Sequence, residues 1–321
     1  MLAVTAVSIS ADDPLSGLHV GERPDPSPPD GWTVVQVRAA ALNHHDLWSL
    51  RGVGLREEQL PIVLGCDAAG IDADGNEVIV HAVVASPDWL GDETFDPKRS
   101  LLSERHDGTL ASLVAVPRRN LVPKPAALSF AEAACLPTAW LTAYRMLFTC
   151  SATRPGDTIL VQGAGGGVAT ALIVLGAAAG LRVWVTSRTE SKRARAVELG
   201  AHGAFETGAR LPDRVDAVME TVGAATWAHS VRSLRPGGTI VVSGATSGAA
   251  PPEDLTRIFF LQLRVIGSTM GNRDELARLA SFCATCGVRP VIDAELPLSD
   301  AIEGFRRMAD GDLFGKIVFT V

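Results

Sequence analysis

The sequence lacks the concentrated positive charge that a nucleic-acid surface needs. Its 321 residues hold 29 Lys and Arg against 36 Asp and Glu, which gives a formal net charge of -7 at pH 7. Binding to a phosphate backbone depends on a clustered excess of Lys and Arg. We therefore expect a small-molecule partner and no nucleic acid.

Long apolar runs are also missing. The first residues, MLAVTAVSIS, contain neither a basic start nor a long apolar region, so they do not predict a secretory signal. The longest apolar run, residues 170–185, is too short to cross a membrane and is better explained by a buried helix followed by a strand. We therefore expect a cytoplasmic protein without a membrane partner.

Cysteine is sparse, with five scattered residues: Cys66, Cys135, Cys150, Cys283 and Cys286. This usage predicts reduced, buried thiols rather than a disulfide framework. Cys283 and Cys286 form a CxxC pair, a pattern found in redox sites and in halves of zinc sites. No second CxxC or histidine pair completes a zinc site, and the surrounding residues favour a helix that ends at Gly287.

The chain is longer than a single core usually serves, so two domains are expected. Residues 1–125 show short alternating strands broken by Pro and Gly, at 32–42, 76–84 and 110–117. This pattern predicts an antiparallel β domain. The polar segment 86–108 within it predicts a surface lobe.

The rhythm changes after a predicted helical stretch at 123–148, which Ser129 caps. Strand-like and helix-like runs then alternate, at 158–163, 168–180, 182–188, 191–201, 215–222, 226–234, 239–244, 255–262 and 264–269. Such alternation predicts parallel strands joined by right-handed crossovers, a doubly wound α/β sheet. Residues 290–321 end in a strand that we expect to return to the first domain, leaving a cleft between two bodies. The predicted domains are 1–125 with 270–321, and 126–269.

The stretch TILVQGAGGGVATALIVLG, residues 158–176, predicts a strand, a glycine turn and a helix. Backbone N–H groups at a helix N-terminus can face a pyrophosphate, and a Cβ in the turn would block that approach. Ala169 is small enough for the helix to pack closely on the strand. The alternative is a merely flexible turn. We predict dinucleotide binding at Gly163, Gly165, Gly166, Gly167 and Val168.

The second strand of this domain indicates which dinucleotide is bound. An acidic residue at its tip bonds the ribose 2′-hydroxyl of NAD, whereas Arg or a small polar residue accepts the 2′-phosphate of NADP. Here the strand ends in VTSRTESKR, with no acid at the tip. We predict NADPH, with Ser187 and Arg188 at the 2′-phosphate and Lys192 or Arg193 adding charge. A solvated basic helix face explains Arg195 and is the alternative for Arg193.

Five stretches occur in a telling order: RPGDTILVQGAGGGVATA, PTAWLTAYRML, LRPGGTIVVSG, IFFLQLRVIGSTMG and GKIVF. In this combination, nearly the whole chain resembles the medium-chain dehydrogenase/reductase superfamily, and within it the zinc-less quinone oxidoreductase branch. The resemblance implies an α/β protein with a GroES-like β-rich catalytic domain and a Rossmann NADPH-binding domain. It also implies a nicotinamide site in the cleft and a homodimer formed through an edge of the Rossmann sheet.

The resemblance further implies where zinc would be bound. At the positions where zinc-dependent members place Cys, His and Cys, this chain has Asn43, Cys66 and Thr138 or a near neighbour. One soft ligand does not hold a catalytic zinc ion, which needs three protein ligands. The lobe at 86–107, where many relatives carry four cysteines, has none. We therefore predict no metal, catalytic or structural.

The stretch LNHHDLW, residues 42–48, holds two adjacent histidines. A single ion could not readily use both together with Asp46, because consecutive side chains diverge. By resemblance, His45 matches a proton-relay position and His44 lies near the cofactor pyrophosphate. The histidine pKa suits proton transfer near neutral pH. The alternative is that both cap a helix start or line the cleft. Asp46 is expected to orient the segment.

Several further site residues are predicted from the resemblance. The predicted catalytic residues are His45, Asn43 and Thr142, with Thr142 against the nicotinamide ring. The predicted substrate pocket contains Cys66 and Trp48, which stands where the branch has a tyrosine. The predicted contacts of the carboxamide are Ser243, Gly244, Ser268 and Met270. Lys316 is predicted to approach a cofactor phosphate.

Without zinc, no strong Lewis acid polarises a carbonyl for alcohol oxidation. Hydride transfer from NADPH to a conjugated acceptor is easier, because conjugation spreads the developing negative charge and donors such as His45 stabilise it. We therefore predict an NADPH-dependent reductase of quinones or α,β-unsaturated ketones. The alternatives are an alcohol or aldehyde dehydrogenase, and an NADPH-binding protein with little turnover.

Overall fold

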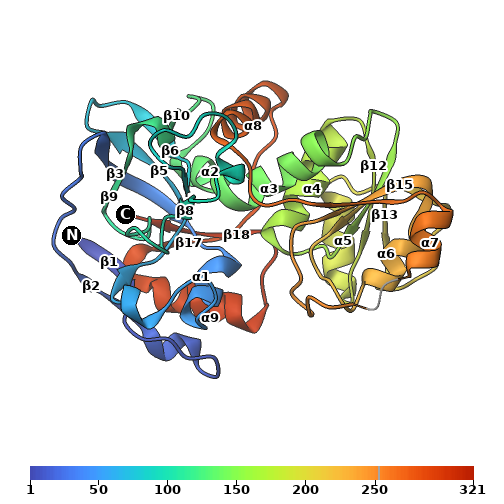
Figure 1. The fold of residues 1–321 in the computed structure, drawn as a ribbon, viewed down its shortest axis with the longest axis horizontal. Coiled ribbons are helices and arrows are strands. Elements are labelled where there is room, and N and C mark those ends of the chain that lie inside the picture. The colour runs from blue at the N-terminus through green and yellow to red at the C-terminus, as the bar shows by residue number, and fades with distance from the viewer. Residues whose placement is uncertain (252–253) are drawn as a thin grey trace. The chain divides into compact units, whose positions relative to one another are not determined.

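The computed structural model describes residues 1–251 and 254–321 (Figure 1). They form two compact units: unit 1 contains residues 1–139 and 272–321, and unit 2 contains residues 140–271. The first boundary lies at 139/140, whereas the sequence placed it at 125/126. The difference arises because helix α2 (Phe130–Ala134) packs on strands β3, β5 and β18 of unit 1.

The main sheet of unit 1 is mostly antiparallel, in the strand order β10-β6-β5-β3-β18-β17, with β9 also pairing with β3. Its strands are β3 (Trp32–Ala41), β5 (Asp67–Asp72), β6 (Glu77–Val80), β9 (Leu113–Pro117), β10 (Leu121–Pro123), β17 (Ile292–Pro297) and β18 (Lys316–Thr320). Two small sheets contain β1 (Leu2–Ala6), β2 (Leu18–Glu22) and β4 (Ile62–Val63), and β7 (Val83–Val84) and β8 (Ser100–Leu101). The predicted strands at 32–42, 76–84 and 110–117 all appear, the second divided between β6 and β7.

The end of the chain returns to unit 1, as predicted. Strand β18 lies between β3 and β17, antiparallel to β3 with Val318 opposite Ala41, and parallel to β17. Three helices of this unit are α1 (His44–Leu50), α8 (Arg273–Cys286) and α9 (Ala301–Asp310). Leu47 and Leu50 of α1 and Phe305 of α9 enter the same hydrophobic core as residues of β3 and β18. The hydrophobic core of unit 1 therefore holds helix α1 in place.

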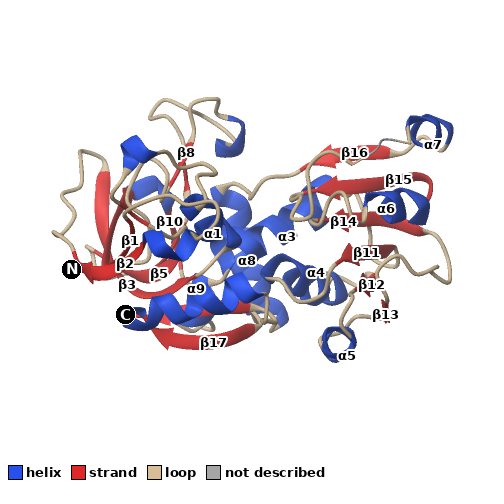
Figure 2. Cartoon of the chain, turned by 90° about the horizontal axis from the view of Figure 1, so that it is seen from below, coloured by secondary structure: helices blue, strands red, loops and turns tan. Residues whose placement is uncertain are grey.

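Unit 2 is a six-stranded parallel sheet in the order β13-β12-β11-β14-β15-β16. Its strands are β11 (Thr158–Gln162), β12 (Arg182–Thr186), β13 (Gly203–Phe205), β14 (Val215–Glu220), β15 (Leu234–Val242) and β16 (Arg264–Gly267). Between them run α4 (Gly167–Ala178), α5 (Glu190–Glu198), α6 (Trp227–Ser233) and α7 (Leu255–Phe260). Figure 2 shows the strands as a stack of red arrows. The predicted alternation is confirmed, and only the short β13 was missed.

The strand order of unit 2 determines where a ligand is expected. The order reverses between β11 and β14, which places a crevice outside the carboxyl ends of these strands. Every residue of β11 is buried, so the glycine turn that follows it starts from a rigid support. Among the described residues, no helix is both long and apolar enough to cross a bilayer.

The helical segment around residues 130–150 is less regular than the sequence predicted. Ser129 Oγ accepts the N–H of Glu132 at 3.1 Å, and Ser129 donates its own N–H to the Glu132 carboxylate at 2.7 Å, so the predicted cap is confirmed. After α2 the chain forms a π-helical turn at 136–140, then α3 (Leu141–Arg145) and a second π-helical turn at 146–150. Such turns occur frequently at functional sites.

All five cysteines are free. The structure corrects the expectation of uniform burial, because Cys286 is exposed and Cys150 is partly exposed. Burial raises the pKa of Cys283 to about 12, so this thiol is unreactive at neutral pH. Helix α8 ends at Gly287, whose φ of 69° is left-handed, as the sequence predicted for a helix end.

Candidate active site

Helix α1 begins at the stretch that holds both histidines. Its N-cap, Asn43, donates the backbone N–H to Asp46 Oδ2 at 2.8 Å. The other oxygen of Asp46 accepts the backbone N–H of Gly65 at 3.0 Å, and the Asp46 side chain is fully buried. Asp46 thus ties α1 to the loop before β5, an arrangement that supports the orienting role predicted for it.

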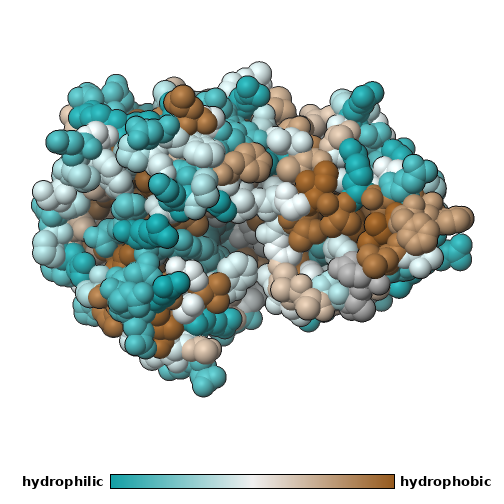
Figure 3. Space-filling model, in the orientation of Figure 1, coloured by the Kyte–Doolittle hydropathy of each residue, from teal (hydrophilic) through white to brown (hydrophobic). Residues whose placement is uncertain are grey.

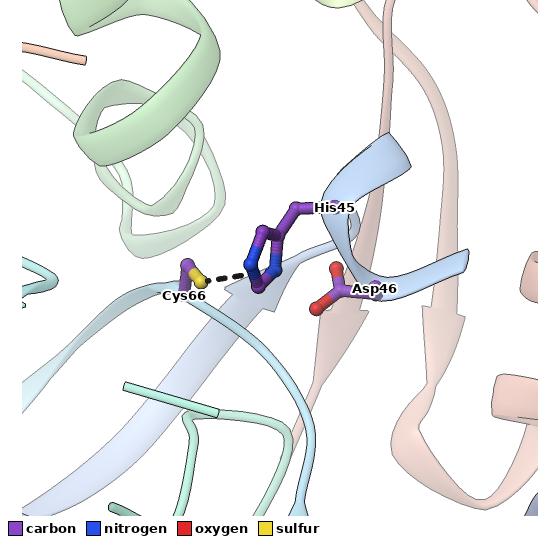
Figure 4. A group of neighbouring side chains, drawn as sticks. All are labelled: His45, Asp46 and Cys66. Atoms are coloured by element: carbon purple, nitrogen blue, oxygen red, sulfur yellow. Dashed lines mark hydrogen bonds between the residues drawn. The ribbon is translucent and has the colours of Figure 1, made fainter. Parts of the chain in front are cut away.

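His45 is held by side chains from two distant parts of unit 1. Its Nε2 lies 3.0 Å from Glu104 Oε1, and its Nδ1 lies 3.6 Å from Cys66 Sγ, toward which the ring points in Figure 4. Burial alone lowers the pKa of this imidazole, but Cys66 and Glu104 outweigh burial and raise the pKa of His45 well above 6.5. The side chain of His45 is 20% exposed.

Cys66, predicted to line the substrate pocket, is 1% exposed. Its Sγ lies 3.4 Å from the carbonyl oxygen of Leu102 and 3.5 Å from Ser103 Oγ. The sulfur is therefore enclosed by residues of the 86–107 lobe as well as by His45. Trp48 is half-buried, and its ring centroid lies 6.4 Å from that of His44. The substrate contacts of Trp48 and Cys66 stay predictions.

Lys316 lies on β18 and is 2% exposed. Its Nζ donates to the carbonyl oxygen of Leu42 at 2.8 Å, to Asn43 Oδ1 at 2.6 Å and to Asp67 Oδ2 at 3.0 Å. The ammonium group has three N–H donors, and all three are used. This geometry argues against the predicted contact with a cofactor phosphate. It gives Lys316 the role of fixing the start of α1, and it accounts for the placement of Asn43.

A metal ion could be held by His45, Asp46 and Cys66. One donor atom each of His45, Asp46 and Cys66 lie within 4.8 Å of one another. His45 and Cys66 offer suitable zinc donors, but both oxygens of Asp46 already accept backbone N–H groups. A catalytic zinc ion needs three protein ligands, and this group supplies two. The residues therefore do not fit zinc, and no step of the reaction is assigned to a metal.

In unit 2 the glycine turn leaves open space at the start of α4. Gly163 has a φ of 91°, the left-handed region that favours glycine. Gly166 is the N-cap of α4, and a Cβ built there would meet no atom within 4 Å. Gly165 is buried, and Gly167 and Val168 form the half-buried first turn. This space in front of the helix N–H groups fits the pyrophosphate of a dinucleotide.

The carboxyl end of β12 carries the residues predicted at the 2′-phosphate. Ser187 is 8% exposed, and Arg188 is exposed, with no ion pair to any residue that the structure describes. Arg193 donates to the carbonyl oxygen of Ser187 at 2.8 Å and lies 3.6 Å from the Glu206 carboxylate. Arg193 therefore braces the strand end and is not part of a solvated face. The cationic side chain at the tip is Arg188.

The predicted carboxamide contacts lie at the carboxyl ends of β15 and β16. Ser268 donates its backbone N–H to the carbonyl oxygen of Val242 at 2.8 Å, which fixes the two strand ends together. Its buried Oγ has no hydrogen-bond partner among the described residues, and its contact with a carboxamide stays a prediction. Ser243 and Gly244 are half-buried, and Met270 has a positive φ of 42°. Thr142, on α3 of the same unit, is 7% exposed.

Glu220 is the last residue of β14, and its side chain is fully buried. Its carboxylate accepts the N–H groups of Val222 and Gly223 at 2.8 and 3.0 Å. It also accepts the hydroxyls of Thr226 and Ser230 at 2.9 and 2.6 Å. Glu220 thereby holds the loop after β14, beside the glycine turn, in one conformation.

Each part of the chain matches a family of oxidoreductases. Residues 29–126 match the alcohol dehydrogenase GroES-like domain, and residues 167–285 match the zinc-binding dehydrogenase family. A zinc-type alcohol dehydrogenase-like protein of Leptosphaeria maculans is 31% identical over 95% of this chain and 94% of its own length. An acryloyl-coenzyme A reductase of Metallosphaera sedula is 28% identical over 95% of this chain and 96% of its own.

Solved structures show the same fold. An NAD-dependent alcohol dehydrogenase, 33% identical, superposes with a TM-score of 0.91 over 100% of both chains. A 2-octenoyl-CoA carboxylase reductase bound to NADP and 2-octenoyl-CoA, 24% identical, superposes with a TM-score of 0.89 over 99% of this chain and 87% of its own. A GroES-like unit joined to a Rossmann unit defines a dinucleotide-dependent oxidoreductase. The chain belongs to the medium-chain dehydrogenase/reductase superfamily.

The predicted family and fold class are therefore confirmed. The solved structures of the same fold include an NAD-dependent alcohol dehydrogenase and a reductase bound to NADP. The matches do not single out the quinone reductase branch, because they include enoyl-CoA reductases and alcohol dehydrogenases.

Proposed function

We propose that the chain is a zinc-independent, NADPH-dependent reductase of a C=C bond conjugated to a carbonyl group. The observation that carries this proposal is the geometry of His45, whose Nε2 lies 3.0 Å from Glu104 Oε1 and whose Nδ1 lies 3.6 Å from Cys66 Sγ. A charged hydrogen-bond donor can stabilise a developing oxyanion without a metal. The open glycine turn of unit 2 supports dinucleotide binding.

Residues of each unit are given a role in this proposal. NADPH, when bound, would supply a hydride from its nicotinamide ring to the β-carbon of the acceptor. His45 donates a hydrogen bond to the carbonyl oxygen, where the electron pair of the C=C bond accumulates, and passes its proton to the product enolate. Asn43, Asp46 and Lys316 hold α1 and therefore His45 in place. Thr142 is proposed to contact the nicotinamide ring.

The acceptor is tested with purified protein and three probes: crotonyl-CoA, 2-cyclohexen-1-one and 1,4-benzoquinone. We expect NADPH consumption with the thioester or the enone, together with a product saturated at the C=C bond. Turnover with 1,4-benzoquinone alone would indicate a quinone acceptor, which the resemblance implied. Binding of NADPH without turnover on any probe would contradict the proposal and leave a cofactor-binding protein.

The second candidate is an alcohol dehydrogenase, which the 33% identical NAD-dependent alcohol dehydrogenase favours. Oxidation of primary and secondary alcohols with NAD or NADP, faster than any enone reduction, would establish it. Metal analysis separates the two further. We expect less than about 0.1 zinc per chain after a chelator wash, because the donor set is incomplete. One zinc per chain, needed for turnover, would overturn the zinc-free assignment.

The choice of nucleotide depends on Arg188 in this proposal. Arg188→Asp places a carboxylate where the 2′-phosphate would lie, and it should lower kcat/KM for NADPH by about 100-fold while NADH is little affected. Arg195→Asp is the matched control on the neighbouring helix α5 and should leave the NADPH/NADH ratio within about twofold. An unchanged ratio in Arg188→Asp would refute the assignment.

Unit 2 also carries the surface for the proposed homodimer. Its edge strand β16 has no neighbour on its outer side among the described strands. Apolar side chains are exposed beside this edge, at Leu255, Phe259, Phe260 and Val265. Brown, hydrophobic atoms gather over this unit in Figure 3. Such a patch marks an interaction site. Phe259→Asp with Phe260→Asp should convert a dimer to a monomer in sedimentation equilibrium, and a monomeric parent protein would rule the dimer out.

A further inference from the structure

The lobe of unit 1 makes an unusual turn just before Glu104. Ser103 has a φ of 68° although it is not glycine, and its side chain is fully buried. Its backbone N–H is bonded to the carbonyl oxygen of His106 at 2.8 Å, so the turn is closed. Non-glycine residues adopt this conformation only where the surroundings enforce it, and such residues gather at functional sites.

This turn brings two consecutive side chains to the same centre. Ser103 Oγ lies 3.5 Å from Cys66 Sγ, and Glu104 Oε1 lies 3.0 Å from His45 Nε2. The lobe therefore contacts both members of the pair formed by His45 and Cys66. Two adjacent lobe residues, Ser103 and Glu104, contact Cys66 and His45 respectively. Such paired contacts are not expected of a lobe that has no role in the site.

The carboxylate of Glu104 occupies a place prepared by other residues. A Cβ on Gly54 would lie 2.8 Å from Glu104 Oε1, so glycine leaves the space that the carboxylate fills. The carbonyl oxygen of Glu104 accepts a hydrogen bond from Gln59 Nε2, which fixes the backbone. The Glu104 side chain is 24% exposed, so its contact with His45 is only partly open to water.

We propose that Glu104 is the positioning residue of the proton donor: it holds Nε2–H of His45 and thereby assigns Nδ1–H to the substrate. This inference rests on the proposed function. The two contacts of the ring differ in strength, since one is a charge-assisted bond of 3.0 Å and the other a 3.6 Å contact with sulfur. The weaker contact is the one that a substrate oxygen displaces. A carboxylate on one ring nitrogen that leaves the other for chemistry is a recurring catalytic arrangement.

Burial lowers the pKa of the His45 ring, and the groups that face it raise that pKa by more than burial lowers it. The groups that face it are Glu104 from the lobe, Cys66 from the loop before β5, and Asp46 from α1 itself. His44 precedes it on the same helix and points its ring toward Trp48. Glu104 is the most exposed of the acidic partners, so it can be neutralised with little effect on packing.

The test replaces Glu104 by glutamine, which keeps the shape and the acceptor oxygen but removes the charge. In the ligand-free protein, ¹⁵N NMR of the imidazole should show the titration midpoint of His45 moving down by about one pH unit or more. With the best acceptor and saturating NADPH, kcat at pH 8 should fall by about tenfold or more. The alkaline limb of the pH profile of kcat should move to lower pH, while KM for NADPH changes by less than about twofold.

The matched controls separate positioning from folding. Glu58→Gln removes an exposed carboxylate of unit 1 that pairs with Arg56, and it should leave both readouts unchanged. Glu104→Asp keeps the charge and should restore most of the imidazole titration. The inference is overturned if Glu104→Gln leaves the His45 midpoint and the pH profile at parental values. A parent protein without reductase activity refutes the proposed function instead, and the NMR titration still tests the Glu104 contact.

Discussion

The candidate groups of unit 1 and those of unit 2 are built in opposite ways. In unit 1 the groups are side chains, buried or half-buried, and each is bonded to others: His45 to Glu104, and Lys316 to Asn43 and Asp67. In unit 2 the start of α4 offers backbone N–H groups, and a Cβ built on Gly166 would meet none of the described atoms within 4 Å. The groups of unit 1 are bonded to other protein groups, whereas the N–H groups at the start of α4 have room for a ligand.

This difference agrees with the two roles proposed above, nucleotide binding by unit 2 and proton donation by unit 1. A pyrophosphate is bound through backbone groups that any sequence can offer if side chains are kept away. A proton donor depends on particular side chains whose charge is set by their neighbours. Removing a side chain should therefore impair proton donation or stability in unit 1, whereas adding a side chain should impair nucleotide binding in unit 2. The predictions below use this contrast, from the largest expected effect to the smallest.

The largest effect is expected at His45. His45→Ala removes the proton donor and should lower kcat by about 10²–10⁴-fold at saturating NADPH, since general acids contribute this much. The Kd for NADPH, measured by fluorescence, should stay within about twofold because the nucleotide is held by unit 2. His19→Ala, at an exposed histidine of the same unit, is the control. A trivial change in turnover would exclude His45 as the acid.

The second effect concerns the buried ion pair behind α1. Lys316→Met should destabilise the chain by about 3–5 kcal/mol in urea unfolding, because it leaves the fully buried Asp67 without its cation. Arg306→Met breaks an exposed pair with Glu303 and should cost less than about 1 kcal/mol. Equal losses in the two variants would show that the buried pair does not support unit 1.

The third prediction adds a side chain to unit 2. Gly166→Ala meets no neighbour and keeps an ordinary φ of -77°, so the free energy of unfolding should change by less than about 1 kcal/mol. The methyl group occupies the space for the pyrophosphate, and the Kd for NADPH should rise by about 10–100-fold. Full NADPH affinity in this variant would mean that the nucleotide binds elsewhere.

The smallest effect is a pH dependence of stability that comes from His81. This residue is fully buried with no partner for its ring nitrogens among the described residues, and burial lowers its pKa from 6.5 to about 3. The unfolded chain takes up the proton first, so His81 should lower stability as pH falls from 6.5 toward 3, by about 1.4 kcal/mol per pH unit. In His81→Leu, the slope of unfolding free energy between pH 6.5 and 5 should decrease by about that amount. An identical slope would contradict this origin.

The sequence predicted what local pattern determines. The alternation of strands and helices over 158–269 and the glycine turn at 163–167 depend on neighbours within one supersecondary unit, and they appear as expected. The cap at Ser129 and the helix end at Gly287 are equally local.

The contacts that complete unit 1 could not be predicted in the same way. Glu104 is 59 residues from His45, and Lys316 is 249 residues from Asp67, with no periodic pattern linking either pair. The segment 86–107 contains several charged residues, and nothing in their order distinguishes Glu104 from the others. The left-handed conformation of Ser103 could not be predicted from the sequence either, because serine does not favour it.

Strand β18 has a consequence for how the protein is made. Residues 140–271 are continuous in the chain, so the Rossmann unit can fold while translation proceeds. Unit 1 is completed only afterwards, because its central sheet includes Lys316–Thr320, which follow the Rossmann unit in the chain. A chain cut before Lys316 would therefore hold a continuous Rossmann unit and a first unit that lacks the strand between β3 and β17.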